Sequence, residues 1–267
     1  MRRTVVIMIS KVGTDKAEIN IIERKAELAV NIAVSLLESG AEVKRAEESA
    51  ERVALALGAK SCEVLALISF ILLTYDATGG ESYTKARRAK GSGVDFTRFE
   101  KLNALSRKIC EGRLDFFDAE KEFLSANQRT ETGKIKPYLL SMTVAFCFAL
   151  FFGGGVFEAV ASAICANTVQ LMNSKVGGKI GNRLLFICVT SFLAGAACLS
   201  TVAVGLAKNY DAVAIGNIML LVPGISIVSA ARDFIGGDLL SGIMRFAEAV
   251  LTALAIAVGF ALPSLLL

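Results

Sequence analysis

The division of charge along this chain constrains its fold more than any other feature. Residues 1–136 contain 23 basic and 20 acidic side chains, whereas residues 137–267 contain only 6 and 5. The second half begins with 38 residues, between Lys136 and Lys175, that carry a single charge at Glu158. Three later stretches carry none: 24 residues over 184–207, 20 over 212–231 and 19 over 249–267. A helix needs about 17–25 apolar residues to cross a bilayer. The sequence therefore predicts a soluble first half and a membrane-embedded second half.

The predicted fold class is a mainly α membrane protein, in which a small α+β cytoplasmic domain over 1–135 precedes a transmembrane domain over 136–267. The uncharged stretches, and the "GGG" break at 153–155, predict about five transmembrane helices. Their expected bounds are about 137–153, 156–173, 184–207, 212–230 and 244–265. Most Lys and Arg residues fall in the loops that would face the cytoplasm, as the positive-inside rule requires. The N-terminal domain is then cytoplasmic and the C-terminus external.

The first domain is predicted to consist of a helical hairpin, a β-hairpin and two further helices. In "LLESGAEVKRAEESAERVALALGA", Gly40 stands where a helix C-cap glycine belongs, and a second apolar stripe runs from Val43 to Leu57. The turn signal "DATGG" separates the run 63–75 from the loosely alternating segment 81–89, which indicates a β-hairpin. Asp95 is expected to cap the helix that follows.

Composition excludes several classes of function. The chain has no His, which removes the commonest general base and metal ligand, and its six cysteines show no C-x-x-C spacing. No catalytic residue, metal or cofactor is therefore expected, and the chain is not predicted to be an enzyme. The net charge of +4 is small, and no basic stripe interleaves with aromatic residues, so nucleic acid is not an expected partner. Lys85, Arg87 and Arg88 could bind an anion, but exposed strands are often basic only for solubility.

Polar residues within the predicted membrane domain are candidates for a substrate or ion pathway, because such groups are costly in a bilayer and usually face protein or water. Glu158, Asp233 and Glu248 are possible proton carriers. The alternative is a structural role, in which the charges around "GGD" only join two helices. The complete candidate set is Glu158, Asn167, Asn217, Pro223, Asp233, Asp238, Arg245 and Glu248.

Two stretches resemble one known family. The helical-hairpin sequence quoted above and "IMLLVPGISIVSAARDFIGGDLLSGIMRFAEAVLTALAIAVG" are similar to the signatures of the bacterial threonine/serine exporter family, which includes a two-subunit succinate exporter. The resemblance covers about 17–265. It implies a multi-pass protein of the bacterial inner membrane. Full-length members carry a second membrane module, so this chain, ending at Leu267, resembles the larger subunit of the split form.

The resemblance implies an exporter subunit for a small polar substrate, either threonine/serine or a C4 dicarboxylate such as succinate. Its expected partners are a separate membrane subunit of four or five helices, membrane lipid and, in an alternative assembly, further copies of itself. The small-residue faces of 156–173 and 184–207 are the expected contact with that subunit. The competing hypothesis is a membrane-anchored regulatory or scaffold protein whose cytoplasmic domain binds a ligand.

Overall fold

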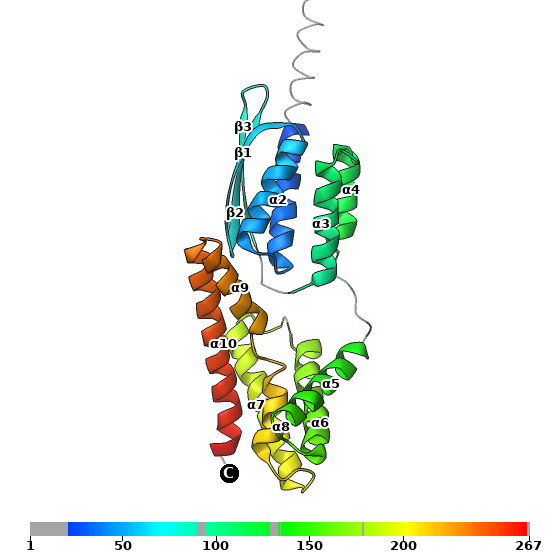
Figure 1. Ribbon diagram of the computed structural model, residues 1–267, viewed down its shortest axis with the longest axis vertical. Coiled ribbons are helices and arrows are strands. Elements are labelled where there is room, and N and C mark those ends of the chain that lie inside the picture. The colour runs from blue at the N-terminus through cyan, green and yellow to red at the C-terminus, as the bar shows by residue number, and fades with distance from the viewer. Residues whose placement is uncertain (1–20, 90–93, 129–132, 134, 178, 266–267) are drawn as a thin grey trace, which may run out of the picture. The chain divides into compact units, whose positions relative to one another are not determined.

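The computed structural model describes residues 21–89, 94–128, 133, 135–177 and 179–265. The chain divides into two compact units, each built from two separate segments (Figure 1). Unit 1 comprises Met1–Thr130 and Ser229–Met244, and unit 2 comprises Glu131–Val228 and Arg245–Leu267. A short stretch late in the sequence thus joins the predicted soluble part.

Unit 1 begins with a helical hairpin. A first helix, described over 21–38, is followed by α2 (Val43–Ala56). Gly40 and Gly58 both have a φ of +98°, a left-handed conformation that glycine adopts without strain and that ends each helix. The stripe predicted for α2 is confirmed, because its apolar residues are buried against the core.

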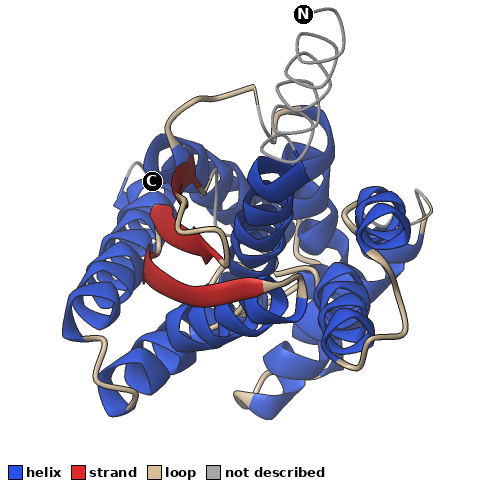
Figure 2. Ribbon diagram, turned by 90° about the horizontal axis from the view of Figure 1, so that it is seen from above, coloured by secondary structure: helices blue, strands red, loops and turns tan. Residues whose placement is uncertain are grey.

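A three-stranded antiparallel sheet covers one side of this hairpin (Figures 1 and 2). Its strands are β1 (Ala59–Leu67), β2 (Phe70–Ala77) and β3 (Ser82–Arg88), with β2 in the centre. Alternate residues of β2 are buried and face the helices, and they include Ile71 and Leu73. The Tyr75 hydroxyl donates to the Leu57 carbonyl at 3.3 Å, which joins the sheet to the end of the hairpin.

The predicted β-hairpin corresponds to β2 and β3, but the prediction lacked β1. Leu67 pairs with Phe70 across a two-residue turn formed by Ile68 and Ser69. Hairpin turns are usually recognised by Gly, Asn or Asp, and this turn contains none of them. The end of β1 and all of β2 therefore appeared in the sequence as one uninterrupted apolar run.

Two further helices complete the first segment of unit 1. They are α3 (Phe96–Cys110) and α4 (Phe116–Ala126), and they lie on the side of the helical hairpin away from the sheet (Figure 1). The predicted cap is confirmed, since the Asp95 carboxylate accepts the Arg98 backbone N–H at 3.0 Å. Arg98 is itself buried, and its guanidinium pairs with Glu38 at 3.2 Å.

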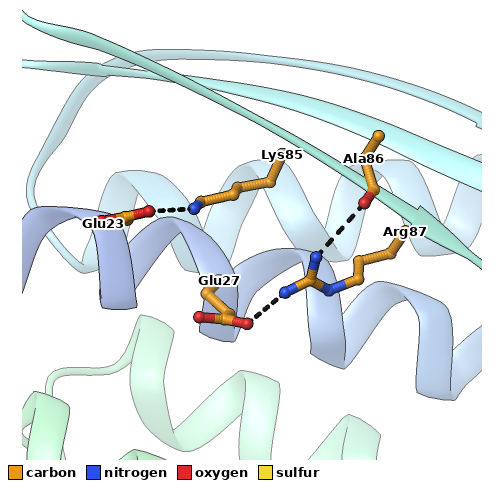
Figure 3. A network of polar contacts seen from close by, with 5 residues as sticks. All are labelled: Glu23, Glu27, Lys85, Ala86 and Arg87. Atoms are coloured by element: carbon orange, nitrogen blue, oxygen red, sulfur yellow. Dashed lines mark hydrogen bonds and ion pairs between the residues drawn. The ribbon is translucent and has the colours of Figure 1, made fainter.

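The basic residues of β3 are largely neutralised within unit 1. Lys85 forms an ion pair with Glu23, and Arg87 forms one with Glu27, so the first helix supplies both carboxylates (Figure 3). These side chains are partly exposed, and such pairs contribute about 0–1 kcal/mol each. With two of its three cations paired, β3 does not support the interpretation of an anion site.

The rest of the described chain is helical. The helices are α5 (Lys136–Phe151), α6 (Val156–Lys175), α7 (Arg183–Ala203), α8 (Tyr210–Ile218), α9 (Gly224–Ile235) and α10 (Leu239–Leu265). Among the described residues, α7 and α10 are long and apolar enough to cross a membrane, and α5 is apolar but shorter. Many large apolar side chains on α5, α6 and α10 are exposed, as on a surface that faces lipid.

The single helix predicted over 212–230 is wrong: α8 and α9 replace it, with a break over 219–223. Proline lacks a backbone N–H and disfavours helical geometry in the residue before it, and Pro223 stands immediately before α9. Ahead of it the chain forms tighter turns, in which Leu221 N–H donates to the Ile218 carbonyl at 2.9 Å. At about 1.5 Å per residue, neither α8 nor α9 alone could span a bilayer.

The connection between the helices predicted over 212–230 and 244–265 is also much shorter than expected. Helix α9 continues to Ile235 and α10 begins at Leu239, so only the residues around Gly237 form the turn. Charge was a poor guide here, because Arg232 and Asp233 lie within α9 rather than outside it. The fifth predicted helix, 244–265, therefore has five additional residues at its start.

Small residues allow the helices of unit 2 to approach closely. A Cβ atom at Gly195 would lie 3.2 Å from Pro263 and 3.3 Å from Phe260, so α7 packs tightly against α10 at that point. Gly259 of α10 makes the reciprocal approach, because a Cβ atom added there would lie 2.8 Å from the Cys188 carbonyl oxygen of α7. This is the packing that membrane helices use when backbones must come close.

Gly216 of α8 makes a similarly close approach, and it yields a first prediction. A Cβ there would lie 2.5 Å from the Ala145 carbonyl oxygen and would also overlap Ser162. We expect Gly216→Ala to force α5, α6 and α8 apart and to lower the unfolding free energy by about 1–3 kcal/mol. Thermal unfolding in detergent measures this loss. Gly224→Ala is the control, since that glycine has open space around it; equal melting temperatures for the two variants would contradict the prediction.

Candidate functional site

Contacts between loops and helix ends define two ends of unit 2. At one end, Tyr138 of α5 and Ser174 of α6 share a hydrogen bond of 3.0 Å. Lys136 lies two positions before Tyr138, and Lys175 follows Ser174. We call this the basic end. At the other end, the Tyr210 hydroxyl donates to the Phe260 carbonyl at 2.9 Å, which joins the start of α8 to the last part of α10.

Glu158 connects two loops at this second end. It lies in the first turn of α6, and its carboxylate accepts the Lys208 backbone N–H at 3.1 Å. The turn between α5 and α6 is thereby joined to the turn between α7 and α8. This contact gives the carboxylate a positioning role in the structure.

Asn217 is the centre of a buried polar cluster in unit 2. It lies in the last turn of α8 and is fully buried. Its amide nitrogen donates to the Ser162 carbonyl at 3.1 Å, to the Ser162 hydroxyl at 3.0 Å and to the Val213 carbonyl at 3.1 Å. Because the two carbonyls are obligatory acceptors, they fix the orientation of the amide.

The oxygen of the Asn217 side-chain amide, unlike its nitrogen, lacks a hydrogen-bond partner in the described part of the chain. Among the described residues, nothing hydrogen-bonds to the Asn217 Oδ1 atom, although it is buried. Leaving a buried acceptor unsatisfied costs about 1–3 kcal/mol, so such an atom in a folded protein calls for an explanation. Asn217 also lies only two positions before the break between α8 and α9, which begins at residue 219.

Two hydroxyls of α7 share this property. Thr190 and Ser191 are both completely buried, and neither side-chain oxygen has a partner within the described part of the chain. Ser191 lies at the close contact with Gly259 of α10. The described part of unit 2 thus contains three buried side-chain oxygens without a hydrogen-bond partner, and the two hydroxyls among them could also donate.

The remaining amide and proline candidates are less enclosed. Asn167 is partly exposed on α6, and its amide donates to the Ile164 carbonyl of its own helix at 3.0 Å. Pro223 is partly exposed in the break, where its carbonyl accepts the Ile227 N–H at 3.1 Å. Neither is brought into the Asn217 cluster by a hydrogen bond that the structure describes.

The four charged candidates of the "GGD" segment fall in different surroundings. Asp233 and Arg245 are almost completely buried, whereas Asp238 and Glu248 are partly exposed. Asp238 lies in the tight turn, where its N–H donates to the Asp233 carbonyl at 2.9 Å. Glu248 forms an ion pair with Arg183 of α7, which adds α7 and α10 to the basic end of unit 2.

Sequence reasoning missed the residues that give this site its geometry. Ser162 is 55 positions from Asn217, and no local pattern connects them. Gly216 beside Asn217 is the one hint, because an isolated glycine within a helix often marks a close backbone approach. Thr190 and Ser191 resembled ordinary small packing residues.

These features together define a class of protein. It is a membrane protein with an α+β domain, a bundle of closely packed helices, and a buried polar cluster beside a broken helix. The chain belongs to the family described as "Putative threonine/serine exporter", whose pattern it matches over residues 27–266. This match confirms the family resemblance found in the sequence.

Two relatives are similar over nearly their whole length. A protein of Klebsiella aerogenes named "Probable succinate transporter subunit YjjP" is 26% identical over 254 residues, covering 92% of this chain and 93% of the relative. The protein of the same name from Escherichia coli (strain K12) is 24% identical over 233 residues, covering 87% and 90%. No solved structure matches the chain.

Proposed function

We propose that this chain is the large subunit of a membrane exporter for a small polar metabolite and acts together with a separate small membrane subunit. The candidate substrates are threonine or serine, and a C4 dicarboxylate such as succinate. The family membership and the word "subunit" in the names of both relatives support the proposal. The broken helix is a further support, since transporters commonly build binding sites from discontinuous helices.

The observation that carries the proposal is the unsatisfied oxygen of Asn217 at the end of α8. A buried acceptor beside a helix break is costly unless some state of the protein gives it a partner. A transported substrate provides such a partner when α8 moves relative to α6. We infer that Asn217 contacts the substrate during transport and that Ser162 holds the amide in position.

The chemistry of this oxygen favours substrates that carry donors. The ammonium and hydroxyl groups of threonine or serine donate hydrogen bonds, whereas a fully ionised dicarboxylate only accepts them. The hydroxyls of Thr190 and Ser191 could donate to a carboxylate, which both substrate classes possess. Competition between labelled threonine and unlabelled succinate, measured as efflux from liposomes, distinguishes the two classes. Liposomes that export neither substrate would contradict the proposed function.

The contacts within unit 2 also support a topology of five spans, with α8 and α9 forming one interrupted span. The basic end includes Lys136, Lys175 and Arg183, whereas Lys208 is the basic residue near the second end. By the positive-inside rule, the basic end faces the cytoplasm. The N-terminal domain is then cytoplasmic and residue 265 lies toward the outside.

Thiol labelling tests this topology. In a variant whose native cysteines are replaced by serine, we expect Lys208→Cys to react with a membrane-impermeant maleimide in intact cells, and Lys179→Cys to react only after lysis. Both lysines are exposed and lie between helices, which makes them a matched pair. Labelling of Lys179→Cys in intact cells, with Lys208→Cys protected, would overturn the topology.

A further inference from the structure

A polar cleft of about 460 Å³ lies between α2 and α3, entirely within unit 1. Its volume falls in the range of about 300–1,000 Å³ that is usual for sites that bind small molecules. The cleft is lined by Glu42, Lys44, Arg45, Glu48, Ser49, Arg52, Asn103, Ser106, Arg107 and Cys110. Neither the family match nor the names of the relatives assign a role to it.

The lining changes character with depth. Ser49 and Ser106 are buried, at 3% and 7% exposure, and Asn103 is half-buried. The charged residues, by contrast, are mostly exposed at the rim. A solvated helix face has no such interior, whereas a binding site is concave and carries a few polar groups that fix the orientation of a ligand.

The cleft carries a surplus of positive charge. Its two carboxylates are already paired, because Glu42 contacts Arg232 of α9 at 3.0 Å and Glu48 contacts Arg52 at 3.8 Å. Among the described residues, Lys44 and Arg107 form no ion pair.

Arg45 adds a third cation without a carboxylate partner among the described residues. Its guanidinium lies 5.0 Å from the centre of the Phe99 ring. Stacking on an aromatic face orients a guanidinium while its N–H groups stay available to a ligand.

We propose that this cleft binds a small organic dianion, a compound with two carboxylates or one phosphate group. Arg107 on α3 presents the planar fork that matches a carboxylate or phosphate, and Lys44 on the facing helix supplies a second charge. The hydroxyls of Ser49 and Ser106 lie deeper in the cleft and supply donors for the oxygens of the anion. Unit 1 therefore has a ligand site of its own, and this inference does not depend on the identity of the transported substrate.

Calorimetry on the full-length chain in detergent tests the proposal with three probes: succinate, inorganic phosphate and threonine, which has no net charge. We expect a dianion to bind and Arg107→Gln to weaken its binding about tenfold, the usual effect of losing one charge-assisted hydrogen bond. Lys101→Gln is the matched control, because Lys101 is an exposed cation of the same helix outside the cleft. Succinate binding alone identifies a dicarboxylate site, and phosphate binding alone identifies a phosphate site.

Cys110 provides a second readout that locates the ligand. The thiol lines the cleft and is exposed, and partial burial raises its pKa above the usual value, so alkylation is best followed at mildly alkaline pH. In a variant that retains Cys110 alone among the cysteines, the bound dianion should slow alkylation severalfold.

Asn217→Leu should leave this protection intact, which separates the cleft from any binding in the membrane unit. Three results would each overturn the proposal: equal binding of threonine, equal weakening by Lys101→Gln, or no protection of Cys110 by either dianion.

Discussion

Liposomes that contain this chain together with a small membrane subunit of the same family should release trapped substrate at least about tenfold faster than liposomes that contain the chain alone. Transporters usually form their path at the junction of two related modules, and this sequence shows no internal repeat. The proposal therefore places the second module in another polypeptide or in another copy of this chain. Efflux of radiolabelled threonine and succinate, at equal amounts of reconstituted protein, measures the difference.

The small-residue faces of α6 and α7, which are the expected contact with this partner, are already covered in the structure. Small residues of α6 and α7, such as Ala161 and Ala194, are buried within unit 2 by its own helices. We therefore expect the partner to use an apolar surface that is still exposed. Liposomes that contain the chain alone provide the decisive result. Full export from them, when chemical cross-linking detects only monomers, would refute the two-subunit proposal.

Asn217→Leu should reduce export about tenfold or more, because a hydrogen bond from a charged group to a buried oxygen is worth roughly 1.5–3 kcal/mol. The substitution keeps a side chain of similar size but removes the Oδ1 atom and the amide donor. Efflux from liposomes that contain both subunits gives the rate. Melting temperature, measured in parallel, separates loss of substrate contact from loss of fold.

Asn167→Leu is the matched control for this substitution. Asn167 is also an asparagine of a membrane-unit helix, but its amide bonds only to its own helix at Ile164. We expect nearly normal export from this variant. Ser162→Ala should give an intermediate loss, since it removes only one of the three contacts that orient Asn217. If Asn217→Leu unfolds the protein without affecting export per folded molecule, Asn217 has a structural role only.

Local patterns predicted the parts of the fold that depend on local chemistry. Gly40, the apolar stripe of α2 and the Asp95 cap are each decided by a few neighbouring residues, and each appears as expected. The strand β1 was missed because its turn at Ile68 and Ser69 carries no turn signal. The helix bounds over 212–265 were misjudged because they were drawn from charge, whereas Pro223 and the tight turn at Gly237 set the real limits.

The candidate site was predicted only as a set of residue types. Asn217 was selected because a polar residue in an apolar run is costly, but Glu158 and Asn167 were selected by the same argument. Burial and hydrogen bonding distinguish them, and both depend on which helices pack together. The contact between Asn217 and Ser162 joins distant parts of the chain, so no window of sequence could contain it.

The composition of unit 1 from two separate segments has a consequence for biosynthesis. The helices and strands of its first segment are complete once about half the chain has left the ribosome, yet its second segment, Ser229–Met244, is made nearly one hundred residues later. Proteins made from the N-terminus fold domain by domain as they emerge. Unit 1 therefore stays incomplete while most of unit 2 is inserted into the membrane. A nascent chain stalled before residue 229 should remain more sensitive to protease than the finished protein.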